Sequence, residues 1–256
     1  MATLLSGELK NHIGEQATVR GWLHTIRNVG ATLAFVIIRD RQGLMQIVLE
    51  NEAEINKLNG CLTGTVLKVH GLVKDAPKSK YGAEIGGETV EVIRAVGYPS
   101  PIDISKDTVN ADGETIHDNK VIALRHPRQM KIFKIAAIAE KYMREFFDKN
   151  EFTQINSPKI IAFPTEGGAE VFKVDYFGRD AYLAQSPQFY KQIMSAIYER
   201  VYEIGRAYRA EKSNTSRHMS EILMLDVEMA FIDGLDDVLE MGEKFMHTVI
   251  EKTWSE

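Results

Sequence analysis

Basic and acidic side chains are grouped in residues 208–231, which read YRAEKSNTSRHMSEILMLDVEMAF. Side chains two residues apart on an extended strand share a face, so Arg209 and Glu211 are predicted to point the same way. A guanidinium is a planar fork of donors that suits a phosphate, and a carboxylate accepts hydrogen bonds from an amino group such as that of adenine. After a polar loop, Arg217 and His218 return further donors to the same end. The pattern favours a nucleotide-binding hairpin.

A purely structural interpretation of this hairpin stays open on periodicity alone. Arginine and glutamate two apart on a strand often form an exposed ion pair that contributes less than about 1 kcal/mol. The second strand carries apolar residues at alternate positions, which predict that a core holds one of its faces: Leu223, Leu225, Val227, Met229 and Phe231. A strand anchored in this way can hold its other face still for a ligand.

The elements that must position this hairpin divide the chain into parts. Residues 1–100 contain five β-rich runs separated by turn residues, and a polar segment after the third run can form a short helix. This is the pattern of an OB-fold, a five-stranded Greek-key barrel that binds oligonucleotides on one face. A small barrel without an RNA role is the alternative.

The rest of the chain changes in character. Residues 101–125 hold prolines, an Asp-Gly pair and mixed charge with little periodicity, which indicates a linker or hinge. In residues 126–256, apolar positions three and four apart predict an amphipathic helix: Ile132, Ile135, Ile138, Ala139, Tyr142, Met143 and Phe146. Short extended segments, a helix starting near Ser186 and Pro187, the hairpin and a last amphipathic helix follow. The predicted fold class is α+β.

Composition narrows the classes of function. The chain has 256 residues, of which 44% are apolar and 26% charged, as in ordinary soluble proteins of two domains. No apolar run is long enough to cross a membrane and no secretory pattern opens the sequence, so a cytoplasmic protein is expected. The net charge of −5 argues against indiscriminate nucleic-acid binding but allows a local RNA site. The single cysteine, Cys61, is expected to be a packed, inert thiol, and no Cys/His spacing suggests zinc.

Three motifs in order resemble those of one enzyme family. The segment RAEKSNTSRHMSE resembles the second signature motif of class II aminoacyl-tRNA synthetases of the aspartyl, asparaginyl and lysyl subgroup. TEGGAEVF at 165–172 and LAQSPQFYKQ at 183–192 narrow the resemblance to the aspartyl-tRNA synthetases, particularly the archaeal type. The resemblance runs from about residue 14 to the last residue. It implies an anticodon-binding OB-fold followed by part of a catalytic domain with an antiparallel sheet and flanking helices.

The resemblance also implies an activity, which is ATP-dependent activation of L-aspartate to aspartyl-adenylate and its transfer to tRNA(Asp). Arg209 would be the catalytic residue, holding the α-phosphate of ATP and later the adenylate. Glu211 would read the adenine amino group. Arg217 and His218 would steer the outer phosphates, and Met219 would complete the ATP site.

Aspartate would be held by residues of all three motifs. Glu166 would pair with its ammonium group, and Gln188 and Arg209 would also contact the amino acid. Gly167–Gly168 would let the backbone move as a lid. Lys191 would meet the side-chain carboxylate and reject asparagine, whose neutral amide would leave a buried ammonium without a counterion. A lysine on a helix surface is the alternative.

The barrel resembles the anticodon-binding domain of the family. Phe35 stands where an aromatic ring stacks on the middle anticodon base, a uridine, and Gln46 and Glu84 stand where side chains read base edges. Arg27 and Arg39 are candidate phosphate or base contacts, and core packing is the alternative for Phe35.

Two positions bear on partners. His24 stands where stricter members carry a larger aromatic residue, which hints at an enzyme that also charges tRNA(Asn). Pro158 follows an amphipathic helix, as in the first class II motif, so the resemblance implies a homodimer with this proline at its interface. A proline that merely ends a strand is the alternative.

The chain departs from the family in its third motif. No arginine follows Arg217, and the only later glycines are Gly234 and Gly242, so the third motif and the Mg²⁺ ligands are expected in a missing C-terminal part. Ile222 stands where many relatives place a phenylalanine against adenine. The chain is therefore expected to be truncated, with a non-catalytic anticodon-binding fragment or an asparagine–tRNA ligase as alternatives. An amino-acid ligase that makes asparagine is disfavoured by the barrel.

Overall fold

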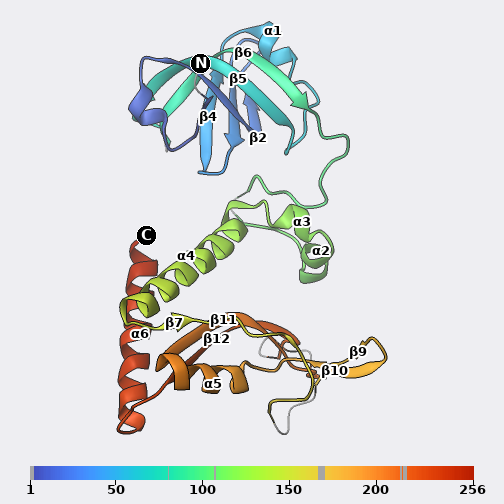
Figure 1. Cartoon of the computed structure of the whole chain (residues 1–256). Helices are drawn as coiled ribbons and strands as arrows, with labels where there is room; N and C mark the ends of the chain where they lie inside the picture. Colours follow the sequence, from blue (N-terminus) through green and yellow to red (C-terminus); the bar gives the residue numbers. More distant parts are fainter. Residues whose placement is uncertain (1–2, 80, 107, 167–170, 214, 216–217) are drawn as a thin grey trace. The chain divides into compact units, whose positions relative to one another are not determined.

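The computed structural model describes residues 3–79, 81–106, 108–166, 171–213, 215 and 218–256. Contacts group the chain into two compact units, Met1–Phe133 and Lys134–Glu256 (Figure 1). Within the described ranges, no helix combines the length and apolar character that a membrane crossing requires.

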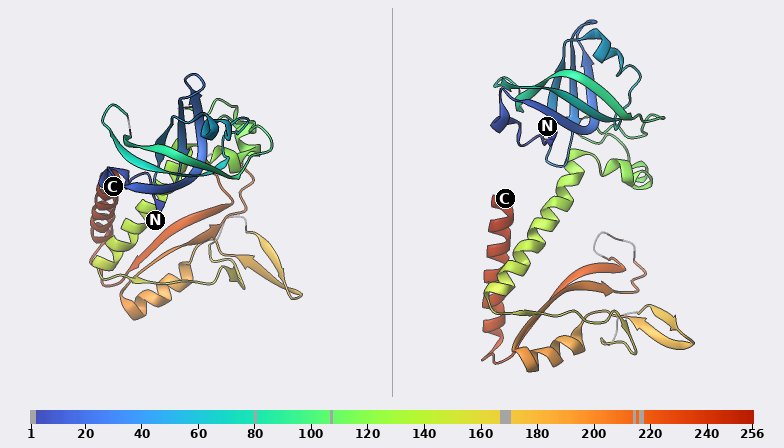
Figure 2. Two further views of the ribbon diagram at one scale, coloured as in Figure 1. Left: turned by 90° about the horizontal axis from the view of Figure 1, so that it is seen from above. Right: turned by 45° about the horizontal axis from the view of Figure 1, so that its top comes forward.

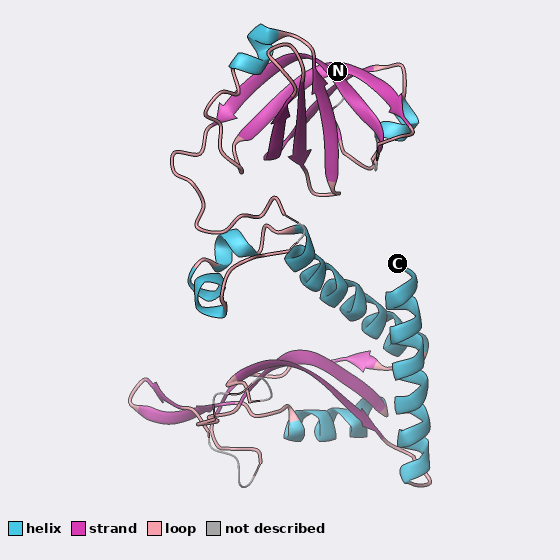
Figure 3. Ribbon diagram, turned by 180° about the vertical axis from the view of Figure 1, so that it is seen from behind, coloured by secondary structure: helices cyan, strands magenta, loops and turns pink. Residues whose placement is uncertain are grey.

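The first unit contains the predicted barrel. Its sheet has the order β1-β2-β3-β4-β6-β5, and an additional pairing of β2 with β5 closes it. Figure 3 shows the strands curled around one core with two short helices at the margin. The elements are β1 (Thr3–Leu4), η1 (Leu9–His12), β2 (Gln16–Asn28), β3 (Ala34–Arg39), β4 (Leu44–Leu49), α1 (Glu52–Asn56), β5 (Val66–Ala76) and β6 (Gly82–Arg94). The five long strands with a helix after the third confirm the OB-fold.

Alternate side chains along the strands point into the barrel and form its core. In β3, Ala34, Val36 and Ile38 are buried in the core, while Phe35 and Ile37 point outward. Where β5 crosses β6, a side chain at Gly71 would collide with the backbone of the opposite strand, so only glycine fits this bulged position.

The predicted linker has more structure than its composition indicated. Two short helices, α2 (Gly113–Asp118) and α3 (Lys120–Ala123), follow the barrel. Asp112 caps α2 by accepting a hydrogen bond from the Thr115 amide at 2.7 Å. A small apolar cluster joins this segment: Ile102, Ile104, Ala123 and the partly buried Val109, Ala111, Ile116 and Ile122. Such short helices give no periodic signal, because they span less than two turns.

The second unit is a layered α+β arrangement. A sheet of order β12-β11-β7 lies between α5 on one face and α4 with α6 on the other (Figures 1 and 2), and a separate small sheet has the order β8-β10-β9. The strands are β7 (Thr153–Gln154), β8 (Ile160–Ile161), β9 (Lys173–Tyr176), β10 (Arg179–Leu183), β11 (Arg200–Tyr208) and β12 (Glu221–Met229). The helices are α4 (Pro127–Lys149), which begins in the first unit, α5 (Gln188–Tyr198) and α6 (Leu235–Ser255).

An aromatic cluster forms the core of this unit. The ring of Phe147 stacks on Tyr202 at 4.8 Å and on Phe245 at 5.1 Å, and Phe146 and Phe152 meet it edge-on. The β12 side chains predicted to face the core do so in part: Leu225, Val227 and Met229 pack against the cluster. Leu223 is half exposed, and Phe231 lies beyond the strand end and is 90% exposed.

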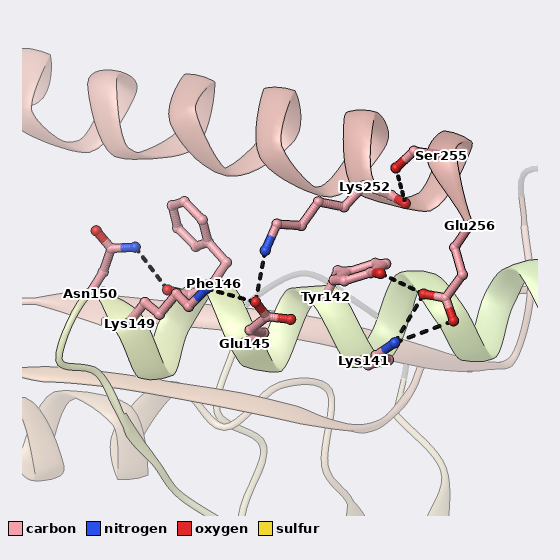
Figure 4. Close-up of polar contacts among 9 residues, drawn as sticks. All are labelled: Lys141, Tyr142, Glu145, Phe146, Lys149, Asn150, Lys252, Ser255 and Glu256. Carbon is pink, nitrogen blue, oxygen red and sulfur yellow. Dashed lines mark hydrogen bonds and ion pairs between the residues drawn. The ribbon is translucent and has the colours of Figure 1, made fainter.

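Polar contacts also join α4 to α6 (Figure 4). Lys252 of α6 and Lys149 of α4 both donate to Glu145 Oε1 at 2.7 Å. At the end of the chain, Glu256 accepts hydrogen bonds from Lys141 and from the Tyr142 hydroxyl. The hydrogen bonds from Lys149 and Lys252 lower the pKa of the Glu145 carboxyl to about 2.

Candidate active site and RNA-binding face

The candidate active site lies on the β11–β12 face opposite the aromatic core. Alternation and antiparallel register place Glu203, Gly205 and Ala207 of β11 on this face, with Asp226 and Glu228 of β12. Because α5 contacts both strands, its side chains are brought to the same surface.

Lys191 of α5 is largely buried against this face. Its Nζ atom lies 3.2 Å from Asp226 Oδ1 and 3.6 Å from Glu228 Oε2. The side chain of Lys191 is only 15% exposed and that of Asp226 12% exposed, so the alternative of a solvated surface lysine does not hold. Two carboxylates near one ammonium compensate its desolvation.

Asp226 and Glu228 belong to none of the motifs from which site residues were predicted. The signal was present, because these acidic residues occupy alternate positions of a strand whose intervening residues are apolar. Alternation alone places them on the non-core face, but it does not identify Lys191 as their partner.

Arg209 follows the last residue of β11. Its amide donates to Ser220 O at 3.0 Å, and the Glu211 amide donates to Arg209 O at 2.8 Å, so the chain turns here. The prediction that Arg209 and Glu211 alternate along one strand was therefore wrong, because the strand ends at Tyr208. The Nε atom of Arg209 is buried and has no hydrogen-bond partner among the described residues. A buried donor in this state suits a ligand that supplies the acceptor.

The loop after Arg209 is described in part. The Nδ1 atom of His218 lies 2.7 Å from Thr215 Oγ1, and the His218 amide donates to Thr215 O at 3.2 Å. Met219 is 57% exposed. Arg217 lies outside the described residues, as do Gly167–Gly168 of the expected lid.

The residues expected around aspartate are joined through a buried amide. Gln185 is completely buried, and its Oε1 accepts a hydrogen bond from the Glu166 amide at 3.3 Å. Ser186 Oγ accepts from the Gln188 amide at 3.3 Å, where α5 begins. The expected cap was therefore wrong by one residue, because Pro187 is the N-cap of α5 and has no side-chain donor or acceptor, while Ser186 only accepts from the amide of the first helical residue.

A buried ion pair also lies on this face of β11. Glu203 is 3% exposed and accepts hydrogen bonds from Lys159 Nζ at 2.5 Å and from Ser157 Oγ at 2.7 Å. Pro158, between these two partners, is exposed in the segment that leads into β8. These contacts fix the strand that ends at Tyr208 and so the position from which Arg209 starts.

The predicted RNA-reading residues lie side by side on the outside of the barrel. The Arg27 guanidinium lies 4.9 Å from the centroid of the Phe35 ring, across the β2–β3 pair. Gln46 Nε2 donates to Glu84 Oε2 at 2.8 Å, across the β4–β6 pair. Phe35 is half buried and does not belong to the core cluster, so the core-packing alternative for its ring does not hold.

His24 and Arg39 differ in their surroundings. His24 is 7% exposed, sits at a β-bulge between Leu23 and Thr25, and lines an open pocket together with Phe35. Arg39 is buried, with its guanidinium 4.7 Å from the Trp22 ring centroid. Burial lowers the pKa of the Arg39 guanidinium, and its Nη1 donates to Met130 Sδ at 3.2 Å.

Two family models match the chain. Residues 17–93 match an OB-fold nucleic acid binding domain of the tRNA anticodon type. Residues 112–256, more than half of the chain, match the class II tRNA synthetases of the D, K and N group. The chain belongs to the class II tRNA synthetases. The resemblance carried by its motifs is thus confirmed.

Curated relatives of this synthetase chain are named as aspartate ligases. The aspartate–tRNA(Asp/Asn) ligase of Methanopyrus kandleri is 40% identical over 248 residues, which cover 95% of this chain and 57% of the relative. The aspartate–tRNA(Asp) ligase of Pyrococcus abyssi is 41% identical over 256 residues and covers 98% of this chain and 58% of the relative. This synthetase chain therefore spans just over half the length of the relatives it matches.

A solved structure has the same fold over the whole synthetase chain. The asparaginyl-tRNA synthetase from Pyrococcus horikoshii, complexed with asparaginyl-adenylate, superposes with a TM-score of 0.91 at 29% identity. It covers 100% of this chain, which in turn covers 59% of that structure. The barrel and the partial catalytic domain are therefore both parts of the known synthetase architecture.

Proposed function

We propose that this chain carries the aspartate-activating face and the anticodon-binding domain of an aspartate–tRNA ligase. The observation that carries the proposal is the Lys191 ammonium, which lies 3.2 Å from Asp226 on the face of the β11–β12 pair, whose first strand ends directly before Arg209. In the first step a carboxylate oxygen of L-aspartate bonds to the α-phosphorus of ATP and pyrophosphate leaves. In the second step the aspartyl group passes from the adenylate to tRNA(Asp), and AMP leaves.

Arg209 has the features needed to bind the α-phosphate. Its buried Nε donor has no partner among the described residues, and a guanidinium binds phosphate oxygens through paired hydrogen bonds. Donors fixed before the reaction stabilise the charge that develops on those oxygens. Glu211, His218 and Met219 follow on the loop and are assigned to the adenine and outer-phosphate contacts, with Arg217.

Lys191 has the features needed to select aspartate. Its ammonium group carries three donors, and the carboxylates of Asp226 and Glu228 lie near it at 3.2 and 3.6 Å. The side-chain carboxylate of aspartate would add an anion to this cation, whereas the amide of asparagine would add a dipole only. Glu166 and Gln188 are assigned to the ammonium group and the carboxylate end of the substrate.

The metal requirement of the family is not met by the described residues. Reactions of ATP in this family use Mg²⁺, but no cluster of three or more metal-binding side chains occurs in the described part of the chain. The ligands of Mg²⁺ are therefore predicted in the part of the relatives that this chain does not span.

The proposed RNA partner is tRNA(Asp), with Phe35 stacking on an anticodon base and Gln46 and Glu84 reading base edges. Their position on the outer barrel surface supports this assignment. His24, which lines the same pocket as Phe35, is assigned to the use of tRNA(Asn) as well. We infer further that the chain acts in the cytoplasm as a homodimer with the exposed Pro158 segment at its interface, which light scattering would test.

The proposed activity is tested by ATP–pyrophosphate exchange with this chain. Exchange that depends on L-aspartate and not on L-asparagine would show that the residues of this chain suffice for the activation step. Exchange with asparagine alone would favour the asparagine–tRNA ligase, an alternative supported by the similarity to the asparaginyl enzyme. If neither amino acid supports exchange while a short RNA with the aspartate anticodon still binds, the chain is an anticodon-binding fragment.

A further inference from the structure

Phe35 and Gln46, two of the three side chains proposed to contact bases, line a pocket that has a second wall. The pocket, of about 850 Å³, belongs entirely to the first unit. On one side it is lined by barrel residues that include Phe35 and Gln46. On the other side it is lined by the segment that connects the barrel to α4 and by the first residues of that helix.

The lining of this pocket is strongly basic. Five of its side chains are cationic: Arg27, Lys78, Lys106, Arg128 and Lys131. No aspartate or glutamate occurs among the described residues that line it, although the chain as a whole carries 36 acidic and 31 basic residues. A local excess of positive charge in an acidic protein points to an anionic ligand.

The second wall is held in place by a buried histidine. His126 is 2% exposed, and its Nδ1 accepts a hydrogen bond from the Arg128 amide at 3.2 Å. Its Nε2 therefore carries the proton and donates to Lys106 O at 2.9 Å. One imidazole thus fixes the backbone of two cation-bearing residues relative to each other.

A further contact connects this wall to the barrel. Arg39 Nη1 at the end of β3 lies 3.2 Å from Met130 Sδ, one helical turn from the start of α4. Because Arg39 is also stacked on Trp22, the contact joins a rigid part of the barrel to the residues between Arg128 and Lys131.

We propose that Lys106, Arg128 and Lys131 bind backbone phosphates of the single-stranded anticodon loop whose bases the barrel reads. This inference rests on the proposed function, because it assumes that an anticodon loop occupies the barrel. Single-stranded RNA combines an anionic backbone with exposed base faces and edges. The pocket offers cationic side chains for the RNA backbone, and an aromatic ring and a glutamine amide for the exposed bases.

The proposal is tested by titrating a fluorescent stem–loop RNA that carries the aspartate anticodon, at several KCl concentrations. The double variant R128Q/K131Q is expected to weaken binding about tenfold at low salt. It is also expected to reduce the slope of log Kd against log salt by about 1.4, because each phosphate contact on a single strand accounts for about 0.7. The variant R128K/K131R should retain the slope, since it retains both charges.

The controls separate the two proposals. Lys120→Gln removes an exposed lysine of the same connecting segment that does not line the pocket, and it should leave Kd and slope unchanged. Phe35→Ala should weaken binding while leaving the slope intact, because it removes stacking and no phosphate contact. A stem–loop with an unrelated anticodon should lose as much affinity as the cognate RNA in R128Q/K131Q, since phosphate contacts carry no sequence information.

Two results would overturn this inference in different ways. In the first, the unmodified chain binds the RNA and Phe35→Ala weakens this binding, but R128Q/K131Q has the same salt slope as Lys120→Gln. The second wall then does not bind phosphate, and the proposed function stands. If the unmodified chain does not bind the stem–loop, the assignment of the barrel fails and the inference fails with it.

Discussion

At the scale of single residues, the candidate active site contains charged side chains that are largely buried and paired with an opposite charge. Lys191 and Asp226 are both less than one-sixth exposed, at 15% and 12%, and lie 3.2 Å apart. Arg209 differs, because its buried Nε has no partner among the described residues. The first pair is satisfied without a substrate, and we propose that a bound ligand supplies the acceptor for Arg209.

Replacing Lys191 tests the first arrangement. Lys191→Gln is expected to weaken binding of a non-hydrolysable aspartyl-adenylate analogue about 10- to 100-fold, because a charge-assisted hydrogen bond to the side-chain carboxylate is lost. Calorimetric titration measures the effect. Lys244→Gln, which removes an exposed lysine paired with Glu240 on α6, is the matched control. An unchanged affinity in Lys191→Gln would show that this lysine does not contact aspartate.

Replacing Arg209 tests the second arrangement. Arg209→Lys keeps the charge but loses the planar fork, so affinity for the same analogue is expected to fall about tenfold or more. Thermal unfolding of the variant should stay close to that of the parent, because the Nε donor has no protein partner to lose among the described residues. A large loss of stability with unaltered affinity would assign Arg209 a structural role instead.

At the scale of elements, α4 and α6 are joined by an aromatic core and by polar contacts along their exposed sides. Phe147 of α4 stacks on Phe245 of α6 at 5.1 Å, and Lys252 of α6 reaches Glu145 of α4 at 2.7 Å. The aromatic contacts are the main source of stability, since exposed ion pairs contribute little. The polar contacts add pH dependence.

That pH dependence has a definite sign. The pKa of Glu145 is lowered from 4.5 to about 2 in the folded chain, so its carboxylate stabilises the fold above pH 4.5. The contribution is lost as the pH falls from 4.5 toward about 2, when the folded chain also takes up the proton. Glu145→Gln should therefore lower the urea midpoint of the second unit at neutral pH, and the difference from the parent should disappear near pH 2.

The matched control for Glu145→Gln is Glu240→Gln. Glu240 also pairs with a lysine, Lys244, but both residues belong to α6 and the contact does not join two helices. Its substitution should change the midpoint less than Glu145→Gln at neutral pH. Equal effects of the two substitutions would mean that the α4–α6 contact of Glu145 adds nothing specific.

At the scale of the whole molecule, the chain consists of two units with separate cores. Apolar side chains of β2 to β6 fill the barrel, whereas aromatic residues of α4, α6 and the β11 strand fill the second unit. The two matched families follow the same division, with an anticodon-binding OB-fold over 17–93 and a class II synthetase domain over 112–256. Separate cores allow each unit to unfold without the other.

Calorimetry of two core variants tests this independence. Ile47→Ala empties a fully buried position in the barrel and should lower one thermal transition, by about 2–5 kcal/mol of stability. Phe147→Ala, at 2% exposure in the second unit, should lower the other transition by about 3–5 kcal/mol. A single transition that both variants shift equally would show that the units unfold together.

Much of this architecture could be predicted from local patterns. Alternating β-rich runs identified the barrel, and apolar spacings of three and four identified the helix now seen as α4. The motifs around Glu166, Lys191 and Arg209 identified the family, because their residue types and order are specific. Periodicity did not reveal α2 and α3, which are too short to show it.

Residue types and their spacing fix which face of each strand is apolar and which family the motifs belong to. Which side chains meet follows from the fold: Lys191 lies near Asp226 and Glu228, and Arg27 lies over the Phe35 ring. The fold also ends β11 at Tyr208, where the chain turns through the Glu211 amide. The physical reason is that strand alternation fixes the direction of a side chain, whereas its partner depends on register and packing between elements distant in the chain.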